Sequence, residues 1–211
     1  MNKTYIQKST SPKLDLFSAF GITTKSIPDR QLEVKEMFKR DWVDQQGDEE
    51  YVPAIPIFKA YEQDLEFVYK GVLRTASEAI RTFLTYLQGA EFSLYDEYSQ
   101  RGIRCRYVSY DSKAHHRIVE EAVVFTVKVK INNPLCYVLS TASTTITTTF
   151  DVPAIVFWDD GTNATFAADT PISKTFADPD HFAIFVLNTI VKQPTNMGDV
   201  ITTDDGDYIT Y

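Results

Sequence analysis

The sequence contains few of the residues from which common enzyme sites are built. Its 211 residues include only three histidines, two cysteines and eight glycines. The glycines are not clustered, so there is no Gly-rich phosphate loop, and no G-x-S-x-G nucleophile elbow occurs. His115 and His116 have no cysteine or carboxylate cluster nearby at ligand spacing, which argues against a metal site. The sequence therefore predicts no catalytic residue, no cofactor and no bound metal.

Long apolar runs are absent as well. No run approaches the roughly 18 residues of a membrane-spanning helix, and the N-terminus lacks the apolar stretch of a secretory signal. We therefore expect neither a membrane span nor a signal peptide. Cys105 and Cys136 lie in or beside predicted strands, which favours buried, reduced thiols. A disulfide is the alternative, but it requires oxidising surroundings.

Positive charge is scarce in the last third of the chain. Residues 131–211 contain ten aspartates, no glutamate and two lysines, whereas the rest of the chain has 19 basic and 19 acidic residues. The net charge of −8 therefore falls entirely in the last third. Binding to a nucleic-acid backbone needs a basic surface, so specific DNA binding is not predicted. An acidic wall would still suit a channel through which DNA passes without sticking.

One helix is predicted, from Thr75 to Gln88. Thr75 and Glu78 have the spacing of a capping box, and Gly89 stands where a left-handed residue ends many helices. The apolar residues between these ends recur at helical spacing and share one face. They are Ala76, Ala79, Ile80, Phe83, Leu84 and Leu87.

Several segments alternate apolar and polar residues, as half-buried antiparallel strands do. They are 61–69, 103–107 and 123–131. In addition, 92–98 is predicted to form a hairpin with 103–110. Because neither apolar face can remain in water, the helix must lie on the sheet that these strands build. The predicted fold class is mainly β with one packed helix (α+β), built as an antiparallel β-sandwich or an open barrel.

Three regions are predicted along the chain. Residues 1–13 are polar and indicate an extended N-terminal arm, residues 14–134 form the helix-bearing β domain, and residues 135–211 form an acidic all-β subdomain. Within the last region, Asp159–Thr162 is predicted to be a hairpin turn. Residues 140–149 are rich in threonine and have three interpretations: an edge strand, a linker or an extended ribbon.

Some aromatic residues have two interpretations each. Trp42 stands in a charged segment beside Arg40, and it either packs against its own domain or anchors a subunit interface, where Trp and Arg are enriched. We name Trp42, Arg40, Phe17 and Phe20 as candidate interface residues. Trp158 would stack on a sugar, together with Tyr208, if the chain were a carbohydrate-binding β-sandwich; core packing is the other interpretation of Trp158.

Several stretches together resemble a known family. They are Leu14–Ile22, Lys39-Arg40-Asp41-Trp42 with Gln46-Gly47-Asp48, the helix ending in Leu87-Gln88-Gly89, the aromatic strand Phe92–Tyr98, and the closing Gly198–Tyr211. In this order they resemble tail proteins of phages and prophages of gut Bacteroidetes, of the distal-tail or tail-tube kind.

The resemblance implies a non-enzymatic virion protein with a tail-tube-type fold and no catalytic residues. It implies assembly into a ring, such as a hexamer or dodecamer, in the cytoplasm of the bacterial host. Sheets of neighbouring subunits would join around a DNA conduit, and adjacent rings of tail or neck proteins would be the partners. Two alternatives remain open: a head–tail connector or tail-terminator protein of the same virion, and the carbohydrate-binding module.

Overall fold

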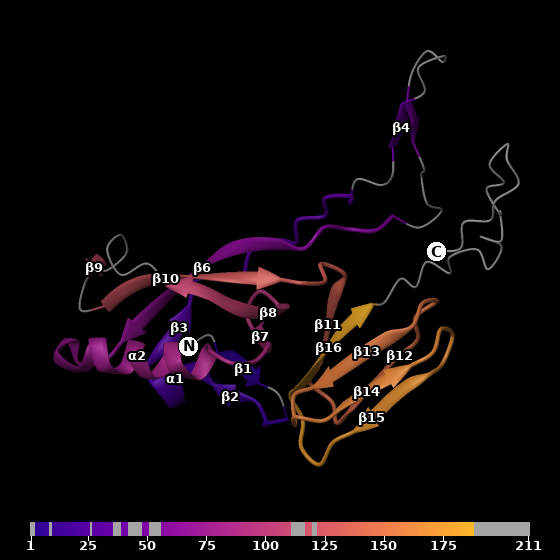
Figure 1. Cartoon of the computed structure of the whole chain (residues 1–211). Helices are drawn as coiled ribbons and strands as arrows, with labels where there is room; N and C mark the ends of the chain where they lie inside the picture. Colours follow the sequence, from indigo (N-terminus) through magenta and orange to yellow (C-terminus); the bar gives the residue numbers. More distant parts are fainter. Residues whose placement is uncertain are drawn as a thin grey trace, which may run out of the picture.

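A computed structural model of the protein describes residues 3–8, 10–25, 27–35, 39–41, 48–50, 56–110, 117–119 and 122–187. Most strands of the first part of the chain form one antiparallel sheet in the order β2-β1-β7-β8-β10-β6-β3, and β9 also pairs with β10 (Figure 1). These strands are β1 (Thr4–Lys8), β2 (Leu14–Asp15), β3 (Ile22–Thr24), β6 (Tyr61–Lys70), β7 (Phe92–Asp96), β8 (Arg101–Tyr110), β9 (Arg117–Val119) and β10 (Ala122–Ile131).

The alternating residues of the long central strands build the core of this sheet. Antiparallel pairing of β6 with β10 places Phe67 opposite Phe125 and Leu65 opposite Val127, and all four side chains are fully buried. The Phe67 and Phe125 rings stack with their centroids 5.6 Å apart. The polar residues between them face the other side of the sheet, as the period-2 pattern predicts.

Two helices cover the inner face of the sheet. The predicted helix is α2 (Ala76–Leu87), and its Phe83 ring lies 5.2 Å from the Phe67 ring. A second, five-residue helix, α1 (Leu16–Phe20), joins β2 to β3, which are the two outermost strands of the sheet. Because α1 also packs against α2, the helices fill the space between the edges of a sheet that stays open. The prediction of a mainly β fold with a packed helix is confirmed.

The start of α2 differs from the predicted capping box. A short 3₁₀ turn, η1 (Leu73–Thr75), leads directly into the helix, and Thr75 makes no side-chain capping bond. Its hydroxyl donates to the Val72 carbonyl oxygen at 3.0 Å instead. An N-cap side chain needs an extended backbone to reach the first-turn N–H groups, and Thr75 has a ψ of 1°. Gly89 has a φ of +88°, the left-handed conformation expected there.

The N-terminal segment lies inside the sheet. We predicted that residues 1–13 extend from the domain as an N-terminal arm. Instead, Thr4–Lys8 forms β1, between β2 and β7, with Ile6 fully buried. The buried Thr4 hydroxyl finds a hydrogen-bond partner here, since it donates to Asp96 Oδ1 at 3.4 Å. Hydrogen bonding of this kind lets a polar segment occupy an interior strand. A search for alternating apolar residues does not detect such a strand.

The strands from Cys136 onward form two further sheets. A four-stranded sheet has the order β11-β16-β13-β14, and β12 pairs with β15 in a separate two-stranded ribbon. Their bounds are β11 (Cys136–Thr141), β12 (Thr145–Thr148), β13 (Ala154–Trp158), β14 (Asn163–Phe166), β15 (Ile172–Thr175) and β16 (His181–Leu187). The predicted hairpin at residues 159–162 is present. Of the Thr-rich tract 140–149, Thr145–Thr148 is one strand of the ribbon, and Ser140 and Thr141 end the edge strand β11.

This second part is a small β-sandwich. One face of the four-stranded sheet, with Trp158 and Phe185, packs against the inward residues Ile146 and Ile172 of the ribbon. Strand β16 is apolar on both faces, and its Phe182 packs away from the ribbon, on Tyr95 of β7 with ring centroids 4.5 Å apart. A strand covered on both faces needs a continuous apolar sequence, which explains FAIFVL in β16.

Candidate assembly surface

A two-stranded ribbon extends from the edge of the large sheet, and we call it the arm. It begins with the pairing of β3 with β6, where Ile22 lies opposite Tyr69. Further along the two segments, Val34 lies opposite Phe58 in an isolated antiparallel bridge. Lys39 lies opposite Glu50 in the ribbon of β4 (Lys39–Asp41) and β5 (Asp48–Glu50). Figure 1 shows β4 standing apart from the large sheet and from the sandwich.

The stem of the arm, residues 31–35 and 56–60, is held by backbone and charge contacts. Lys35 N donates to Ile57 O at 2.6 Å, and Lys59 N donates to Glu33 O at 2.8 Å. Lys59 Nζ lies 2.7 Å from Glu33 Oε1. These bonds keep the two segments extended side by side.

One face of the stem is apolar and open to solvent. Leu32 and Val34 are 50% and 51% exposed, and they alternate with the charged Glu33 and Lys35. Alternation places the two apolar side chains on one face of an extended segment. A two-stranded ribbon is marginally stable alone. The arm is therefore an element whose apolar face lacks a cover from the described part of this chain.

The tip of the arm carries opposite charges in register. The pairing sets Lys39 opposite Glu50 and Arg40 opposite Glu49. Oppositely charged residues directly across an antiparallel ladder favour that register. The same register sets Asp41 opposite Asp48, so only two of the three pairs join opposite charges. In the sequence, Lys39-Arg40 and Glu49-Glu50, on either side of Gly47, were the signal for a hairpin that the search for alternating apolar residues missed.

The predicted interface residues lie on two separate elements. Arg40 belongs to β4 in the arm, and Trp42 lies outside the described residues. Phe17 and Phe20 are on α1 at the body of the protein. Phe17 is 36% exposed, whereas Phe20 is half-buried and packs on the Phe83 and Tyr86 rings of α2. The structure thus leaves Phe17 available at the body, and its role at an interface stays a prediction.

A buried polar cluster ties the first sheet to the sandwich. Asp159, at the end of β13, has a fully buried side chain, and Lys13, in the loop before β2, places its Nζ 2.7 Å from Asp159 Oδ2. His181 Nδ1 lies 2.9 Å from the same oxygen, and its ring stacks on Phe176. We expected Asp159 to serve turn geometry only; it also joins two distant parts of the chain, a role that no local sequence pattern reveals.

The described residues contain no group of three or more histidine, cysteine, aspartate or glutamate side chains that could hold a metal ion. Cys105 and Cys136 are free and buried. Burial raises the pKa of the Cys136 thiol to about 11 and raises the pKa of Cys105 well above its ordinary value. Both thiols are thus protonated at neutral pH and poor nucleophiles.

Of the other sequence candidates, the structure describes Trp158, and this residue offers no open site. Trp158 is only 4% exposed, because it packs between Phe176 and Phe185, so it cannot stack on a sugar. Tyr208, His115 and His116 lie outside the described residues. Among the helices that the structure describes, none has the length and apolar character to cross a membrane.

Comparison with known proteins gives similarity to solved structures but no sequence match. No known protein-family profile matches the chain, and no curated protein sequence matches it. Among solved structures, the chain is similar to the Dit protein of phage SPP1, which is described as a paradigm of the hub adsorption apparatus in phages that infect Gram-positive bacteria. The similarity covers 86% of this chain and 97% of that chain, with 11% sequence identity and a TM-score of 0.39. At these values it carries no argument about fold or function.

Proposed function

We propose that this protein is a non-enzymatic structural subunit of a bacteriophage tail that assembles into a ring around a DNA conduit. Its place would be the tube, the distal tail or the hub region. The sequence resemblance to tail proteins motivates the proposal, and the gut Bacteroidetes host belongs to the same proposal.

The arm is the single observation that carries it. Leu32 and Val34 form an exposed apolar face on an element that stands apart from the body. Burying such a face on a neighbouring copy would remove apolar surface from water, at about 25 cal/mol for each Å². A contact between an arm and a different surface of the next copy is heterologous, and heterologous contacts give a ring when the rotation between copies closes and an open filament when it does not. A hexamer or dodecamer is the expected assembly.

The charge distribution supports a conduit through which DNA moves freely. Exposed aspartates such as Asp151, Asp169 and Asp178 lie in the sandwich, where Lys174 is already engaged by Asp160. Acidic surface repels a phosphate backbone. A ring that presented this part to its lumen would therefore pass DNA without holding it.

The solution mass tests the proposal. Light scattering across a range of concentrations is expected to give a discrete multiple of the 24.0 kDa chain. Leu32→Asp with Val34→Asp should shift the mass to the monomer, because charges on the apolar face oppose its burial. Val72→Asp is the matched control, since Val72 is 69% exposed but lies before α2, away from the arm. A wild-type monomer at all concentrations, alone and with neighbouring tail proteins, would contradict the ring.

A head–tail connector or tail-terminator protein is the alternative from the same virion. It differs in its neighbours and not in its chemistry, so the proteins that co-purify with virion fragments distinguish the two. The carbohydrate-binding alternative loses its aromatic platform at Trp158, because that side chain is buried.

A further inference from the structure

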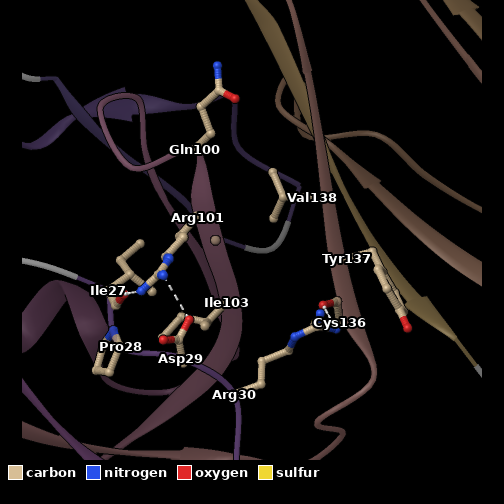
Figure 2. A pocket seen from close by; sticks show the side chains of 11 residues that line it. Ile27, Pro28, Asp29, Arg30, Gln100, Arg101, Ile103, Cys136, Tyr137 and Val138 are labelled. Atoms are coloured by element: carbon tan, nitrogen blue, oxygen red, sulfur yellow. Dashed lines mark hydrogen bonds and ion pairs between the residues drawn. The ribbon is translucent and has the colours of Figure 1, made fainter.

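A cleft lies at the base of the arm, between the large sheet and the sandwich (Figure 2). It has a volume of about 250 Å³. One wall is the start of β8 with the segment 27–30, and the other is the start of β11, residues 136–138. The cleft is distinct from the exposed face of the arm, and nothing in the tail proposal uses it.

The β11 wall is an open strand edge. Among the described strands, β11 has β16 as its sole pairing partner. Leu187 N donates to Leu135 O, and Cys136 lies opposite Val186, so the backbone N–H and C=O groups of Cys136 and Val138 point away from β16. An open edge of this kind can accept an extended peptide as an additional strand.

Arg30 reaches this edge from the opposite wall. Its Nη1 donates to the Cys136 carbonyl oxygen at 2.9 Å, and its guanidinium lies 4.5 Å from the centroid of the Tyr137 ring. Figure 2 shows this side chain running along the cleft toward Cys136. A guanidinium has five N–H donors, and within the described residues Arg30 has no carboxylate partner. Stacking on the Tyr137 ring holds the planar guanidinium of Arg30 in place for an incoming carboxylate.

Arg101 is the second cation of the cleft and already binds a carboxylate. Its Nη2 lies 2.9 Å from Asp29 Oδ1, and its Nη1 donates to Ile27 O at 3.4 Å. The Asp29 side chain is 82% exposed. An exposed ion pair is screened by water and contributes little to stability. Asp29 therefore occupies Arg101 weakly and can be displaced.

We propose that this cleft binds an acidic, extended peptide segment of a partner protein, which adds as a strand to β11. The Arg30 and Arg101 guanidinium groups would take its carboxylates, and the free backbone groups at Val138 would pair with its main chain. Apolar side chains in the walls, Ile27, Ile103 and Val138, suit a peptide better than a bare inorganic anion. Bidentate guanidinium pairs form with carboxylates and with phosphates, so the apolar walls and the strand edge are what favour a peptide.

The test measures binding of a fluorescently labelled probe peptide, acetyl-Val-Asp-Val-Asp-Val-amide, by anisotropy. The wild-type protein should bind it, and the same peptide with Asn in place of both Asp should not bind. Arg30→Gln and Arg101→Gln should each weaken binding by roughly tenfold, the loss of one charge-assisted pair. Arg81→Gln is the matched control: Arg81 is an exposed arginine on α2 far from the cleft in sequence, and its loss removes the same charge.

Asp29→Asn gives a prediction of opposite sign. Removal of the internal carboxylate frees Arg101, so the probe should bind about two- to fivefold more tightly. A merely structural role of these residues would not tighten binding. A probe with N-methylated valines should bind more weakly, because N-methylation removes the donors that pair with β11.

Three results would overturn the proposal. The first is that the Asn peptide binds as tightly as the Asp peptide, and the second is that the affinity is unchanged in both arginine variants. The third is that inorganic phosphate binds at this cleft as tightly as the peptide, which would indicate a site for small anions. None of these outcomes depends on whether the protein forms a ring.

Discussion

Lys13 Nζ lies 2.7 Å from Asp159 Oδ2, and this contact joins residues 146 positions apart in the chain. The Asp159 side chain is fully buried, and the Lys13 side chain is 23% exposed. Lys13 Nζ also donates to Asp180 O at 2.7 Å, so one lysine holds both turns at this end of the sandwich. The contact fixes the sandwich against the loop that precedes β2.

Asp159→Asn should lower the free energy of unfolding by about 3 kcal/mol, because loss of one member of a buried pair leaves the other charge uncompensated. Urea unfolding followed by tryptophan fluorescence measures it. Asp178→Asn is the control, since this turn aspartate is exposed, and its effect should stay within about 0.5 kcal/mol. A loss for Asp159→Asn as small as that of the control would show that the cluster does not tie the two parts together.

Gly161→Ala should destabilise the protein much more than Gly89→Ala. Both glycines are left-handed, with φ of +90° and +88°, so the backbone strain is matched. A Cβ at Gly161 would lie 2.3 Å from Thr10 O, whereas nothing lies within 4 Å of a Cβ at Gly89. Alanine at either position should cost about 1 kcal/mol of backbone strain. At Gly161, overpacking should add about 1–3 kcal/mol to this cost. Equal midpoints of thermal unfolding for the two variants would contradict this close approach.

Lys8→Met should destabilise the end of α2. Lys8 Nζ, from β1, donates to the carbonyl oxygens of Tyr86 and Gln88, which have no partner within the helix. A cation at a helix C-terminus contributes about 0.3–1 kcal/mol through the helix dipole. Hydrogen exchange of the last-turn amides should accelerate in Lys8→Met and remain unchanged in Lys128→Met, where an exposed lysine on β10 is replaced.

The ion pair of Asp160 with Lys174 should make stability depend on acid pH. Burial by itself raises the pKa of Asp160, but hydrogen bonds from Lys174 and Thr162 outweigh burial and lower the pKa below its ordinary value of 3.8. A lowered pKa in the folded state adds stability above pH 3.8, which is lost as the pH falls through the folded-state pKa.

Wild type should therefore exceed Asp160→Asn in free energy of unfolding at neutral pH, and the difference should vanish at about pH 2. In a Lys174→Met background the same substitution should have a smaller effect at neutral pH, because the main partner is gone. A difference that stays constant with pH would contradict the ion pair.

Cys105 and Cys136 should not react with Ellman's reagent in the native protein. Burial raises the pKa of both thiols, so neither the access nor the thiolate that the reaction needs is present. In urea both should react rapidly. Fast reaction of either thiol in the native state would show that the contact between β8 and β11 opens readily.

Local patterns determined much of this protein from sequence. The period of 3.6 residues placed α2, the period of 2 placed β6 and β10, and Asp-Gly placed the turn after β13, because each pattern reports which side of a local element is buried. Neither β1 nor the arm could be found in this way, since Thr4 and Gln7 are polar but buried and Leu32 and Val34 are apolar but exposed.

The surfaces that carry the functional proposals were decided by the tertiary structure alone. Arg30, Arg101 and Cys136 are far apart in sequence and meet only because β8 packs across β11. Lys13 and Asp159, 146 positions apart, likewise meet only through tertiary packing. Sequence periodicity reports the neighbours of a residue along its own helix or strand, whereas an assembly surface depends on which elements pack together. The sequence by itself thus determined the elements and the uneven charge, and long-range packing decided the arm, the cleft and the buried cluster.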